Sequence, residues 1–322
     1  MTAAPAPSTS PAPSQVRHFL RDDDLTQAEQ AEILDLAIAV KQDRFANTPL
    51  AGPQTVAVIF DKSSTRTRVS FAVGISDLGG APLIISTESS QLGGKESVSD
   101  TARVLERQVA AIVWRTYAQS GLEEMAHGTT VPVVNALSDD FHPCQLLADL
   151  LTIRERRGAL AGLTVAFVGD GSSNMGHSYL LACATAGMHV RIGAPDDYRP
   201  SQRVIDDAHG IAGRTGGSVT VLADPIAAVA GADVVVTDTW VSMGFETEKA
   251  ARIASLSGYK VTQELMARAA DDALFLHCLP AYRGYEVDAE VIDGPQSAIW
   301  DEAENRLHAQ KALLIWLLRQ RD

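Results

Sequence analysis

The chain has 322 residues, 46% of them hydrophobic and 21% charged, a composition that is ordinary for a folded globular protein. Its formal net charge is −13, which argues against binding nucleic acid through a broad basic surface. At about 150 residues per domain, the length predicts two domains.

Residues 1–14 are rich in Pro, Ala and Ser and contain neither a basic segment nor an apolar core, so we expect a disordered tail and not a targeting leader. The apolar run 312–318 is far shorter than the ~20 residues of a membrane-spanning helix. The three cysteines, Cys144, Cys183 and Cys278, are odd in number and lack the spacing of paired metal ligands. We therefore expect a cytoplasmic protein with no membrane segment, no disulfide framework and no metal.

Short runs of apolar and β-branched residues alternate with helical patterns along the rest of the chain. Strands that alternate with helices are typical of parallel sheets, so the predicted fold class is α/β, with two lobes that each hold a parallel β-sheet flanked by helices. The predicted strands are 55–60, 83–85, 111–113, 131–134, 164–168, 190–192, 219–222, 234–237 and 274–276.

The boundary between the lobes is predicted near a helix at about 145–157, because Gly158 and Gly162 follow it before the next strand begins. A last helix, predicted at about 307–321, carries enough apolar residues to dock on one of the lobes. The predicted divisions of the chain are 1–14, 15–150, 151–303 and the helical segment 304–322.

The segment Ser64-Thr65-Arg66-Thr67-Arg68 concentrates hydroxyl and guanidinium groups between the first strand and a helical pattern. Backbone N–H groups at a helix N-terminus lack intrahelical partners, and the helix dipole is positive there, so this position favours a phosphate. A simple helix cap with two solvated arginines is the alternative interpretation. Five such residues in succession favour the anion site.

Further polar residues follow the ends of other predicted strands: Arg115 follows 111–113, Asp238 follows 234–237, and His277 follows 274–276. Ligands of open parallel sheets bind beyond the carboxyl ends of the strands. We therefore expect these residues to meet the phosphate segment in one cleft between the lobes.

Each of these residues also has an ordinary structural interpretation. Asp238 after a strand is most often a helix cap, Cys278 a small buried hydrophobe, and Arg306 a solvated residue in the first turn of the last helix. A lone histidine before proline is usually a structural contact, but His142 is followed one helical turn later by Gln145 on the same side.

A dehydrogenase is one alternative function, because strand 164–168 runs into Gly169-Asp170-Gly171. The next glycine is Gly176, and the following strand ends in Gly193-Ala194-Pro195 where an acidic residue is expected, so the dinucleotide fingerprint does not fit. A non-catalytic binding or regulatory protein is the second alternative. Such a protein would be expected to lose site residues that are present here.

The phosphate segment resembles the carbamoyl phosphate signature of the transcarbamoylases, and the resemblance covers nearly the whole chain after its first ~15 residues. Four further matches follow in the family's order: Arg115 in Val113-Trp114-Arg115-Thr116, His142-Pro143-Cys144-Gln145, Asp238-Thr239-Trp240-Val241-Ser242-Met243-Gly244, and His277-Cys278-Leu279-Pro280. The last two of these matches favour the ornithine-using branch of the aspartate/ornithine transcarbamoylase family over the aspartate-using one.

The resemblance implies transfer of a carbamoyl group from carbamoyl phosphate to the side-chain amine of ornithine, which gives citrulline and phosphate without a cofactor. Both synthesis and breakdown of arginine use this reaction, and we expect synthesis. The resemblance also implies that the last helix returns to the first lobe, which would bind carbamoyl phosphate while the second lobe binds ornithine.

The roles of the site residues are likewise implied by the resemblance. Ser64, Thr65, Arg66 and Thr67 correspond to the family's phosphate-binding residues. Residues near the carbonyl group and the reacting amine are Arg115, His142, Gln145, Cys278, Leu279 and Arg306, and those taken as catalytic are Arg115, His142, Cys278 and Arg306, with Cys278 in a positioning role.

For ornithine, Asp238 is similar to the residue that pairs the α-ammonium, Asn174 to the contact of the α-carboxylate, and Ser242 with Met243 to the turn at the amino-acid end. Many relatives carry a second Asn where this chain has Ser173. Gln91 lies on a loop that in the family crosses into a neighbouring subunit's active site. The resemblance therefore implies a homotrimer with shared sites.

Overall fold

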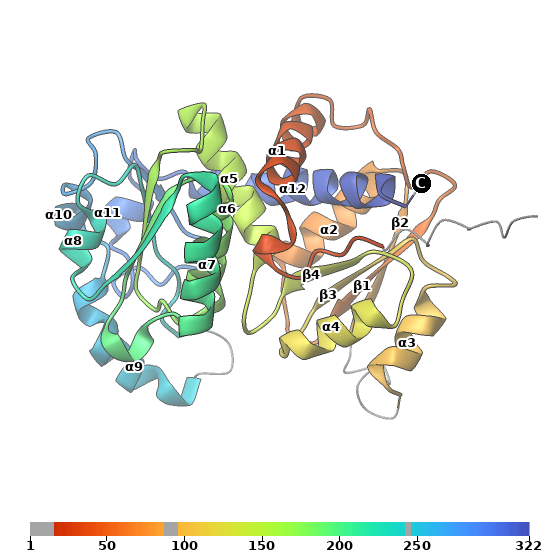
Figure 1. Cartoon of the computed structure of the whole chain (residues 1–322), viewed down its shortest axis with the longest axis horizontal. Coiled ribbons are helices and arrows are strands. Elements are labelled where there is room, and N and C mark those ends of the chain that lie inside the picture. The colour runs from red at the N-terminus through yellow and green to blue at the C-terminus, as the bar shows by residue number, and fades with distance from the viewer. Residues whose placement is uncertain (1–15, 87–95, 242–245, 322) are drawn as a thin grey trace, which may run out of the picture.

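The computed structural model describes residues 16–86, 96–241 and 246–321, so the predicted tail and the predicted residues Gln91, Ser242 and Met243 lie outside the described part. It contains a four-stranded parallel sheet in the order β2-β1-β3-β4 and a five-stranded parallel sheet in the order β7-β6-β5-β8-β9 (Figure 1). The predicted α/β fold with two parallel sheets is therefore confirmed. The strands are β1 Thr55–Phe60, β2 Ala81–Ser86, β3 Ala111–Arg115, β4 Val133–Leu137, β5 Thr164–Val168, β6 His189–Gly193, β7 Ser218–Leu222, β8 Val234–Val236 and β9 Leu274–Leu276.

Helices cover both faces of each sheet (Figure 1). They are α1 Gln27–Gln42, α2 Arg66–Asp77, α3 Val98–Leu105, α4 Gln119–His127, α5 Pro143–Arg157, α6 Asn174–Thr185, α7 Gln202–Thr215, α8 Pro225–Val229, α9 Lys249–Leu256, α10 Gln263–Met266, α11 Ala289–Ile292 and α12 Ile299–Arg319. Short 3-10 helices within the described ranges are η1 Asp22–Asp24, η3 Asp196–Tyr198, η4 Glu246–Glu248 and η5 Ser257–Tyr259. None of the helices within the described ranges is both long and apolar enough to cross a membrane.

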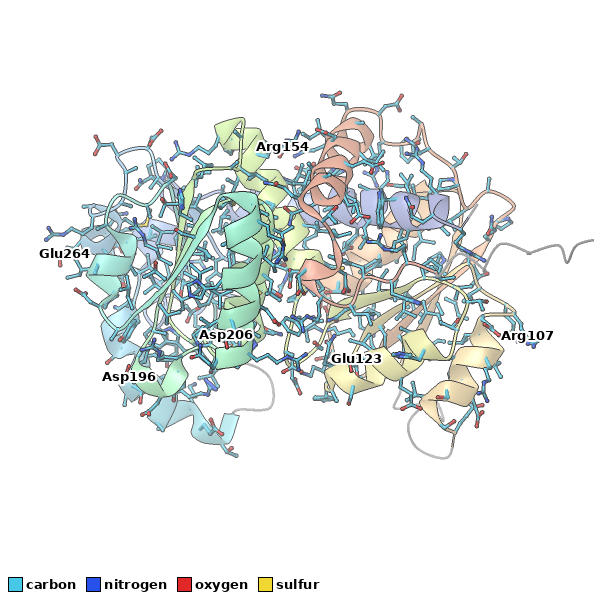
Figure 2. The ribbon with its side chains drawn as sticks, in the orientation of Figure 1. Arg107, Glu123, Arg154, Asp196, Asp206 and Glu264 are labelled. Carbon is cyan, nitrogen blue, oxygen red and sulfur yellow. The ribbon has the colours of Figure 1, made fainter. Side chains whose placement is uncertain are left out.

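Alternate residues of the strands point to opposite faces of the sheet, and in β1 the two faces enter different hydrophobic clusters. In β1, Val56 and Val58 join a cluster that also includes residues of α1, α5, α6, α12 and the second sheet, whereas Ala57 and Ile59 face α3 and α4. The first of these clusters is shared by both sheets, so the two lobes have a common apolar core. Charged side chains such as Arg107, Glu123 and Glu264 lie exposed on the outer surface (Figure 2).

Most strand predictions agree with the structure, but β4 runs from Val133 to Leu137 where 131–134 was predicted. The strand continues through Asn135, a residue type that strands usually avoid. This asparagine is fully buried, and its Nδ2 donates to the Leu20 carbonyl at 2.9 Å. The contact with a segment distant in sequence satisfies the amide nitrogen of Asn135 within the strand.

The last helix is longer than the sequence predicted, because α12 begins at Ile299 and not near residue 307. Its first turns contain Asp301 and Glu302, acidic residues that favour a helix N-terminus, but they break the apolar pattern used to predict the helix. As a result Arg306 lies in the third turn and is 4% exposed, so it is not a solvated residue of the first turn.

Helices α5 and α12 connect the two halves of the molecule (Figure 1). Helix α5 begins with Pro143, contacts β4 of the first sheet and α6 of the second half, and ends at Gly158, whose φ of 80° requires a residue that tolerates the left-handed conformation. Helix α12 packs along α5, α1 and α2. These contacts place the N-terminal ends of α2 and α5 close to the carboxyl ends of the strands.

Candidate active site

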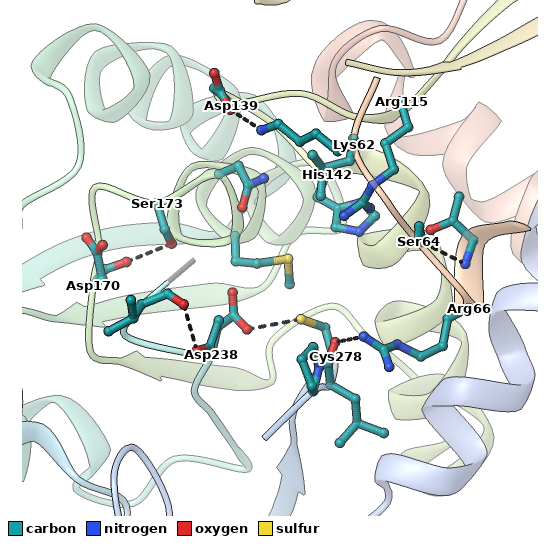
Figure 3. A pocket seen from close by; sticks show the side chains of 18 of the residues that line it. Lys62, Ser64, Arg66, Arg115, Asp139, His142, Asp170, Ser173, Asp238 and Cys278 are labelled. Carbon is teal, nitrogen blue, oxygen red and sulfur yellow. Dashed lines mark hydrogen bonds and ion pairs between the residues drawn. The ribbon is translucent and has the colours of Figure 1, made fainter. Parts of the chain in front are cut away.

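A cavity of about 400 Å³ lies where the carboxyl ends of strands from both sheets face one another (Figure 3). The predicted site residues in the described ranges all line it except Gln145, Arg68 and His277, the last of which is buried beside Cys278. Those that line it are Ser64, Thr65, Arg66, Thr67, Arg115, His142, Asn174, Asp238, Cys278, Leu279 and Arg306.

The phosphate segment occupies the predicted turn between β1 and α2. Thr65 is the N-cap residue of α2, and the Ser64 hydroxyl accepts a hydrogen bond from the Thr67 N–H at 3.3 Å. The first turn of α2 contains no acidic residue, so its free N–H groups and dipole favour an anion.

The two arginines of this segment differ in position. Arg66 lines the cavity, and its guanidinium donates to the Leu279 carbonyl at 2.6 Å, so it joins the two lobes across the cavity. Leu279 has a φ of 56°, in the left-handed region. Arg68 instead lies over the Phe60 ring at 4.9 Å and is not among the residues that line the cavity. The expected anion contact of Arg68 is therefore wrong, because successive residues of a helix face different directions.

The guanidinium groups of Arg115 and Arg306 and the imidazole of His142 form one wall of the cavity. Arg115 is 7% exposed, and burial together with the charges of Arg306 and Arg66 lowers its pKa to about 10. Its Nε is buried without a hydrogen-bond partner within the described ranges. Arg115 thus remains charged at neutral pH and has donor capacity that the protein does not satisfy, which suits an anionic or partly negative ligand.

His142 lies beside these arginines and is 5% exposed. Burial, then the charges of Arg306 and Arg115, hold its pKa well below the usual range, so the imidazole is neutral at physiological pH. Its Nδ1 has no partner in the part of the chain described. A neutral imidazole can donate one N–H to a ligand without adding charge to the site.

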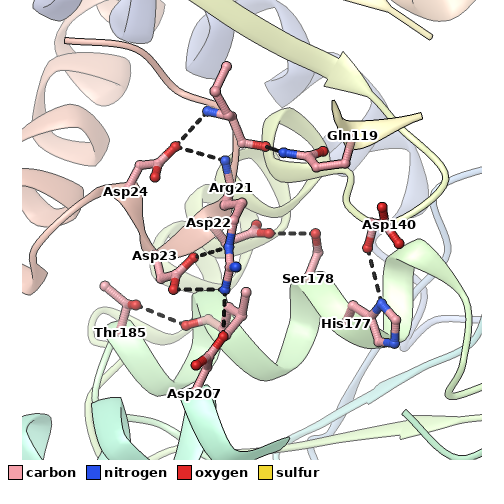
Figure 4. A network of polar contacts seen from close by, with 12 residues as sticks. Arg21, Asp22, Asp23, Asp24, Gln119, Asp140, His177, Ser178, Thr185 and Asp207 are labelled. Carbon is pink, nitrogen blue, oxygen red and sulfur yellow. Dashed lines mark hydrogen bonds and ion pairs between the residues drawn. The ribbon is translucent and has the colours of Figure 1, made fainter. Parts of the chain in front are cut away.

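The backbone of His142 is held by Ser178, which belongs to a polar network that joins the two lobes; Figure 4 shows this network around Ser178, Asp22 and Arg21. Its N–H donates to the Ser178 hydroxyl at 2.9 Å, and that hydroxyl donates to Asp22 at 2.5 Å. Nearby, Arg21 of the first lobe donates to Asp207 on α7 at 2.8 Å. The position of His142 therefore depends on contacts with the second lobe.

Gln145 does not line the cavity, although the sequence predicted it beside His142. Its side chain is 1% exposed and lies behind Arg306, whose guanidinium donates to the Gln145 amide oxygen at 2.5 Å. The amide nitrogen donates to Asp149 and Glu302 at 2.8 and 3.0 Å. In this structure Gln145 supports Arg306 from behind the wall.

The opposite side of the cavity is acidic. Asp238 follows β8 and is 9% exposed, and burial raises the pKa of its carboxyl group. The Cys278 thiol donates to Asp238 Oδ1 at 3.2 Å (Figure 3). Burial and the neighbouring Asp238 charge raise the pKa of this thiol well above the usual range, so Cys278 is not a thiolate nucleophile at neutral pH.

Asn174 is the first residue of α6, and its Nδ2 donates to the Ser138 carbonyl at 2.8 Å while the residue lines the cavity. Ser173, the residue before it, caps α6 by accepting from the Gly176 N–H at 3.2 Å.

Two ion pairs at the cavity were not predicted. Lys62 is 8% exposed, pairs with Asp139 and lies 4.4 Å from the centre of the Tyr117 ring. Arg252 donates to Asp170 at 2.6 Å and to the Trp240 carbonyl at 3.3 Å. Lys62 belongs to the segment that precedes Ser64, which was a usable signal, whereas nothing near Arg252 in the sequence indicates a site.

Ligand atoms of Asp238, His277 and Cys278 lie within 4.8 Å of one another, which is close enough to consider a metal. However, His277 Nδ1 accepts from the Leu279 N–H at 2.9 Å and its Nε2 lies 3.3 Å from Glu286. Both imidazole nitrogens are therefore engaged, and the Cys278 thiol is protonated. The arrangement fits a ligand ammonium better than a metal ion.

Two family models match the sequence. One, described as the carbamoyl-P binding domain of aspartate/ornithine carbamoyltransferase, matches residues 17–155. The other, described as the Asp/Orn binding domain of the same family, matches residues 161–317. Together they span both lobes.

Individual proteins show the same similarity along nearly the whole chain. The ornithine carbamoyltransferase of Clavibacter sepedonicus is 77% identical over 94% of this chain and 99% of its own. The solved structure of the ornithine carbamoyltransferase from Pyrococcus furiosus has a TM-score of 0.89 at 44% identity, over 94% of this chain and 97% of its own. The anabolic ornithine carbamoyltransferase from Campylobacter jejuni has a TM-score of 0.89 at 39% identity, over 95% of this chain and 100% of its own.

Proposed function

Because this chain belongs to the aspartate/ornithine carbamoyltransferase family, we propose that it transfers the carbamoyl group of carbamoyl phosphate to the side-chain amine of L-ornithine, which yields L-citrulline and phosphate. The observation that carries this function is one cavity with a cationic wall at a helix N-terminus and a buried carboxylate, Asp238, on the opposite side.

The phosphate group is proposed to bind at the start of α2. Ser64, Thr65 and Thr67 offer hydroxyl and backbone N–H groups there, and Arg66 adds a guanidinium that lines the same cavity. This site retains the phosphate as it leaves, since the same donors bind the inorganic ion.

The carbonyl oxygen of the carbamoyl group is proposed to face Arg115, His142 and Arg306. Negative charge grows on this oxygen when the amine attacks, so donors fixed in a buried wall stabilise the tetrahedral intermediate more than the ground state. Burial keeps His142 neutral, and it therefore donates a hydrogen bond without repelling the guanidinium groups beside it. Gln145 acts by holding Arg306.

Ornithine is proposed to bind against the second lobe. Asp238 pairs with the α-ammonium, Asn174 contacts the α-carboxylate, and the Ser242-Met243 turn, outside the described residues, contacts the amino-acid end. The protonated Cys278 thiol and the Leu279 carbonyl orient the reacting amine. An alkyl amine has a reference pKa of about 10.4, so the amine loses a proton before it attacks.

The domain division follows from these roles. We assign carbamoyl phosphate binding to residues 15–150 with the helical segment 304–322, and ornithine binding to residues 151–303. The three cysteines of the sequence are free, which agrees with a cytoplasmic location. We also place the reaction in the biosynthetic direction of arginine metabolism.

Arg66→Ala should raise the KM for carbamoyl phosphate by about 10- to 150-fold, because it removes a charge-assisted contact of about 1.5–3 kcal/mol. Steady-state kinetics with varied carbamoyl phosphate measure the change. Arg68→Ala is the matched control, since Arg68 lies on the same helix but outside the cavity, and it should leave KM nearly unchanged. Equal effects of the two substitutions would remove Arg66 from the binding site.

A homotrimer with shared sites is proposed for the assembly, with Gln91 contributed by a neighbouring subunit. In support, α2 and the edge strand β2 expose apolar side chains, with Val69 at 55% and Leu83 at 45% exposure.

Light scattering on the full chain should give a trimer. Mixing inactive Arg115→Met and Gln91→Ala subunits should restore part of the activity, because some mixed sites would contain both native residues. A fully active monomer, or no restored activity on mixing subunits that do exchange, would contradict shared sites.

The reaction itself is tested by offering carbamoyl phosphate with ornithine, aspartate, putrescine or N-acetylornithine in parallel and measuring carbamoylated product. We expect citrulline from ornithine alone. Asp238 disfavours the second carboxylate of aspartate, putrescine has no carboxylate for Asn174, and an acetamide cannot pair with a carboxylate as an ammonium does. Product from another amine would overturn the ornithine assignment, and no product from any amine would favour a non-catalytic role.

A further inference from the structure

Two carboxyl groups that the proposed reaction does not use lie directly behind the cationic wall. Asp149 on α5 is fully buried, and Glu302 on α12 is 1% exposed. The Gln145 amide nitrogen donates to an oxygen of each, at 2.8 Å to Asp149 and 3.0 Å to Glu302. The two groups are thus adjacent, and two negative charges at this distance in a buried site strongly disfavour each other.

The contacts around the pair distinguish its two members. The Tyr179 hydroxyl donates to Asp149 Oδ2 at 2.6 Å, which is in the range of an O–H···O⁻ contact to an ionised carboxylate. Glu302 Oε2 accepts the His277 backbone N–H at 2.9 Å, which a neutral carboxyl group also accepts. These contacts leave Asp149 ionised and Glu302 protonated toward it.

Burial of the two carboxyl groups favours the same protonation state of the pair. It raises the pKa of Asp149 to about 6, and it raises the pKa of Glu302 well above the usual range, so the pair holds one proton at neutral pH. The titratable groups that face the pair are Tyr179 and Cys183 from α6, Arg306 from α12, and His277 and Cys278 from the segment after β9.

A pair with one proton has a defined effect on the wall in front of it. Both hydrogens of the Gln145 amide nitrogen are used by the two carboxyl groups, so the amide oxygen must face Arg306, which donates to it at 2.5 Å. Arg306 also donates to Thr67 Oγ1 at 3.3 Å. A reversed Gln145 amide would place a donor against the guanidinium.

We propose that Asp149 and Glu302 are positioning residues that share a single proton carried by Glu302, and that the pair fixes the Gln145 amide and, through it, Arg306 at the carbamoyl phosphate site. The proposal rests on the proposed carbamoyl transfer. The ionised Asp149 also offsets part of the positive charge of the wall, and the Glu302 contact to the His277 N–H ties the segment that carries Cys278 to α12.

The two isosteric amide substitutions should then behave differently. In Glu302→Gln, the amide oxygen still accepts from His277 and the new NH2 group donates to Asp149 as the proton did, but this NH2 group also faces the Gln145 amide nitrogen, which loses one of its two acceptors. In Asp149→Asn, one orientation turns an NH2 group onto the Gln145 amide nitrogen, and the other leaves the Tyr179 hydroxyl hydrogen without an acceptor. Every orientation of the introduced asparagine side chain therefore leaves a buried polar conflict.

We expect Glu302→Gln to raise the KM for carbamoyl phosphate less than Asp149→Asn does, because the ionised Asp149 still accepts from the Gln145 amide nitrogen and keeps the amide oxygen toward Arg306. Asp149→Asn should raise the KM for carbamoyl phosphate by about 5- to 150-fold, the effect of one buried unsatisfied group, with a smaller change in the KM for ornithine. Thr152→Val is the matched control: Thr152 is buried on the same helix one turn further and bonds to Asn305 at 2.9 Å, away from Arg306. It should lower thermal stability but leave KM unchanged.

Infrared difference spectra of wild type minus Glu302→Gln at neutral pH test the proton without relying on activity. The difference should contain the carbonyl stretch of a protonated carboxylic acid. A lost carboxylate band in its place, or a Glu302→Gln variant as impaired as Asp149→Asn, would overturn the proposal. Absence of citrulline formation by the wild type would instead overturn the proposed function, while the infrared result still decides the protonation.

Discussion

Replacing Arg115 by methionine should lower kcat by about 10²–10³-fold, which is the usual loss when one donor to a developing oxyanion is removed. Arg115 lines the cavity with a buried Nε that has no partner within the described ranges, so its donor capacity is available to the substrate. Methionine keeps most of the apolar stem and removes only the charged donor. Single-turnover and steady-state rates of citrulline formation measure the effect.

The stability of this variant separates a catalytic loss from misfolding. The pKa of Arg115 is lowered to about 10, mainly by burial, so its charged form is less favourable in the folded protein than in the unfolded chain. This penalty is present at pH values below the folded-state pKa and fades as the group deprotonates above it. At neutral pH we therefore expect Arg115→Met to unfold at a temperature equal to or above that of the wild type. An inactive variant with a lowered melting temperature would not support the catalytic role.

Asp238→Asn should lower kcat/KM for ornithine by about two to four orders of magnitude. Removing one partner of a buried ion pair costs about 3–5 kcal/mol, because the other charge stays buried and unpaired. The carboxylate is 9% exposed and lines the cavity opposite the arginines, so solvent cannot replace it. Ornithine saturation curves at a fixed, saturating concentration of carbamoyl phosphate measure the loss.

Asp233→Asn is the matched control for this substitution. Asp233 precedes β8 while Asp238 follows it, and Asp233 accepts from the Thr164 N–H at 2.8 Å away from the cavity. Its loss should affect stability and leave the KM for ornithine nearly unchanged. The binding of carbamoyl phosphate should remain within about threefold of the wild type in both variants. Equal losses for the two aspartates would contradict the ammonium-binding role.

Local patterns were sufficient to predict most of the fold. The strands β1, β5 and β9 have the predicted bounds, because apolar runs bounded by turn residues depend on neighbours within a few positions. The start of α2 at the Ser64-Thr65 segment followed in the same way, from the strand that precedes it and the helical spacing of the residues that follow. The start of α12 was missed because Glu302 and Asn305 are buried polar residues, whose partners lie on α5.

The candidate site likewise has features that the sequence predicted and features that it could not indicate. The sequence identified the residue types and placed them after strands, and eleven of the predicted residues line one cavity. It could not indicate that Gln145 lies behind the wall, that Arg68 turns away, or that Arg252 lines the cavity. Each of these depends on which helix face meets which neighbour.

Local sequence patterns therefore define the elements, their order and the chemical groups available at the ends of the strands. The distances between these groups and their protonation states arise only in the folded protein. The Arg306–Gln145 bond joins residues 161 positions apart, and the Cys278–Asp238 bond joins residues 40 apart. Periodicity and capping act over about one helical turn, whereas desolvation and paired hydrogen bonds arise only when distant segments exclude water from the same space.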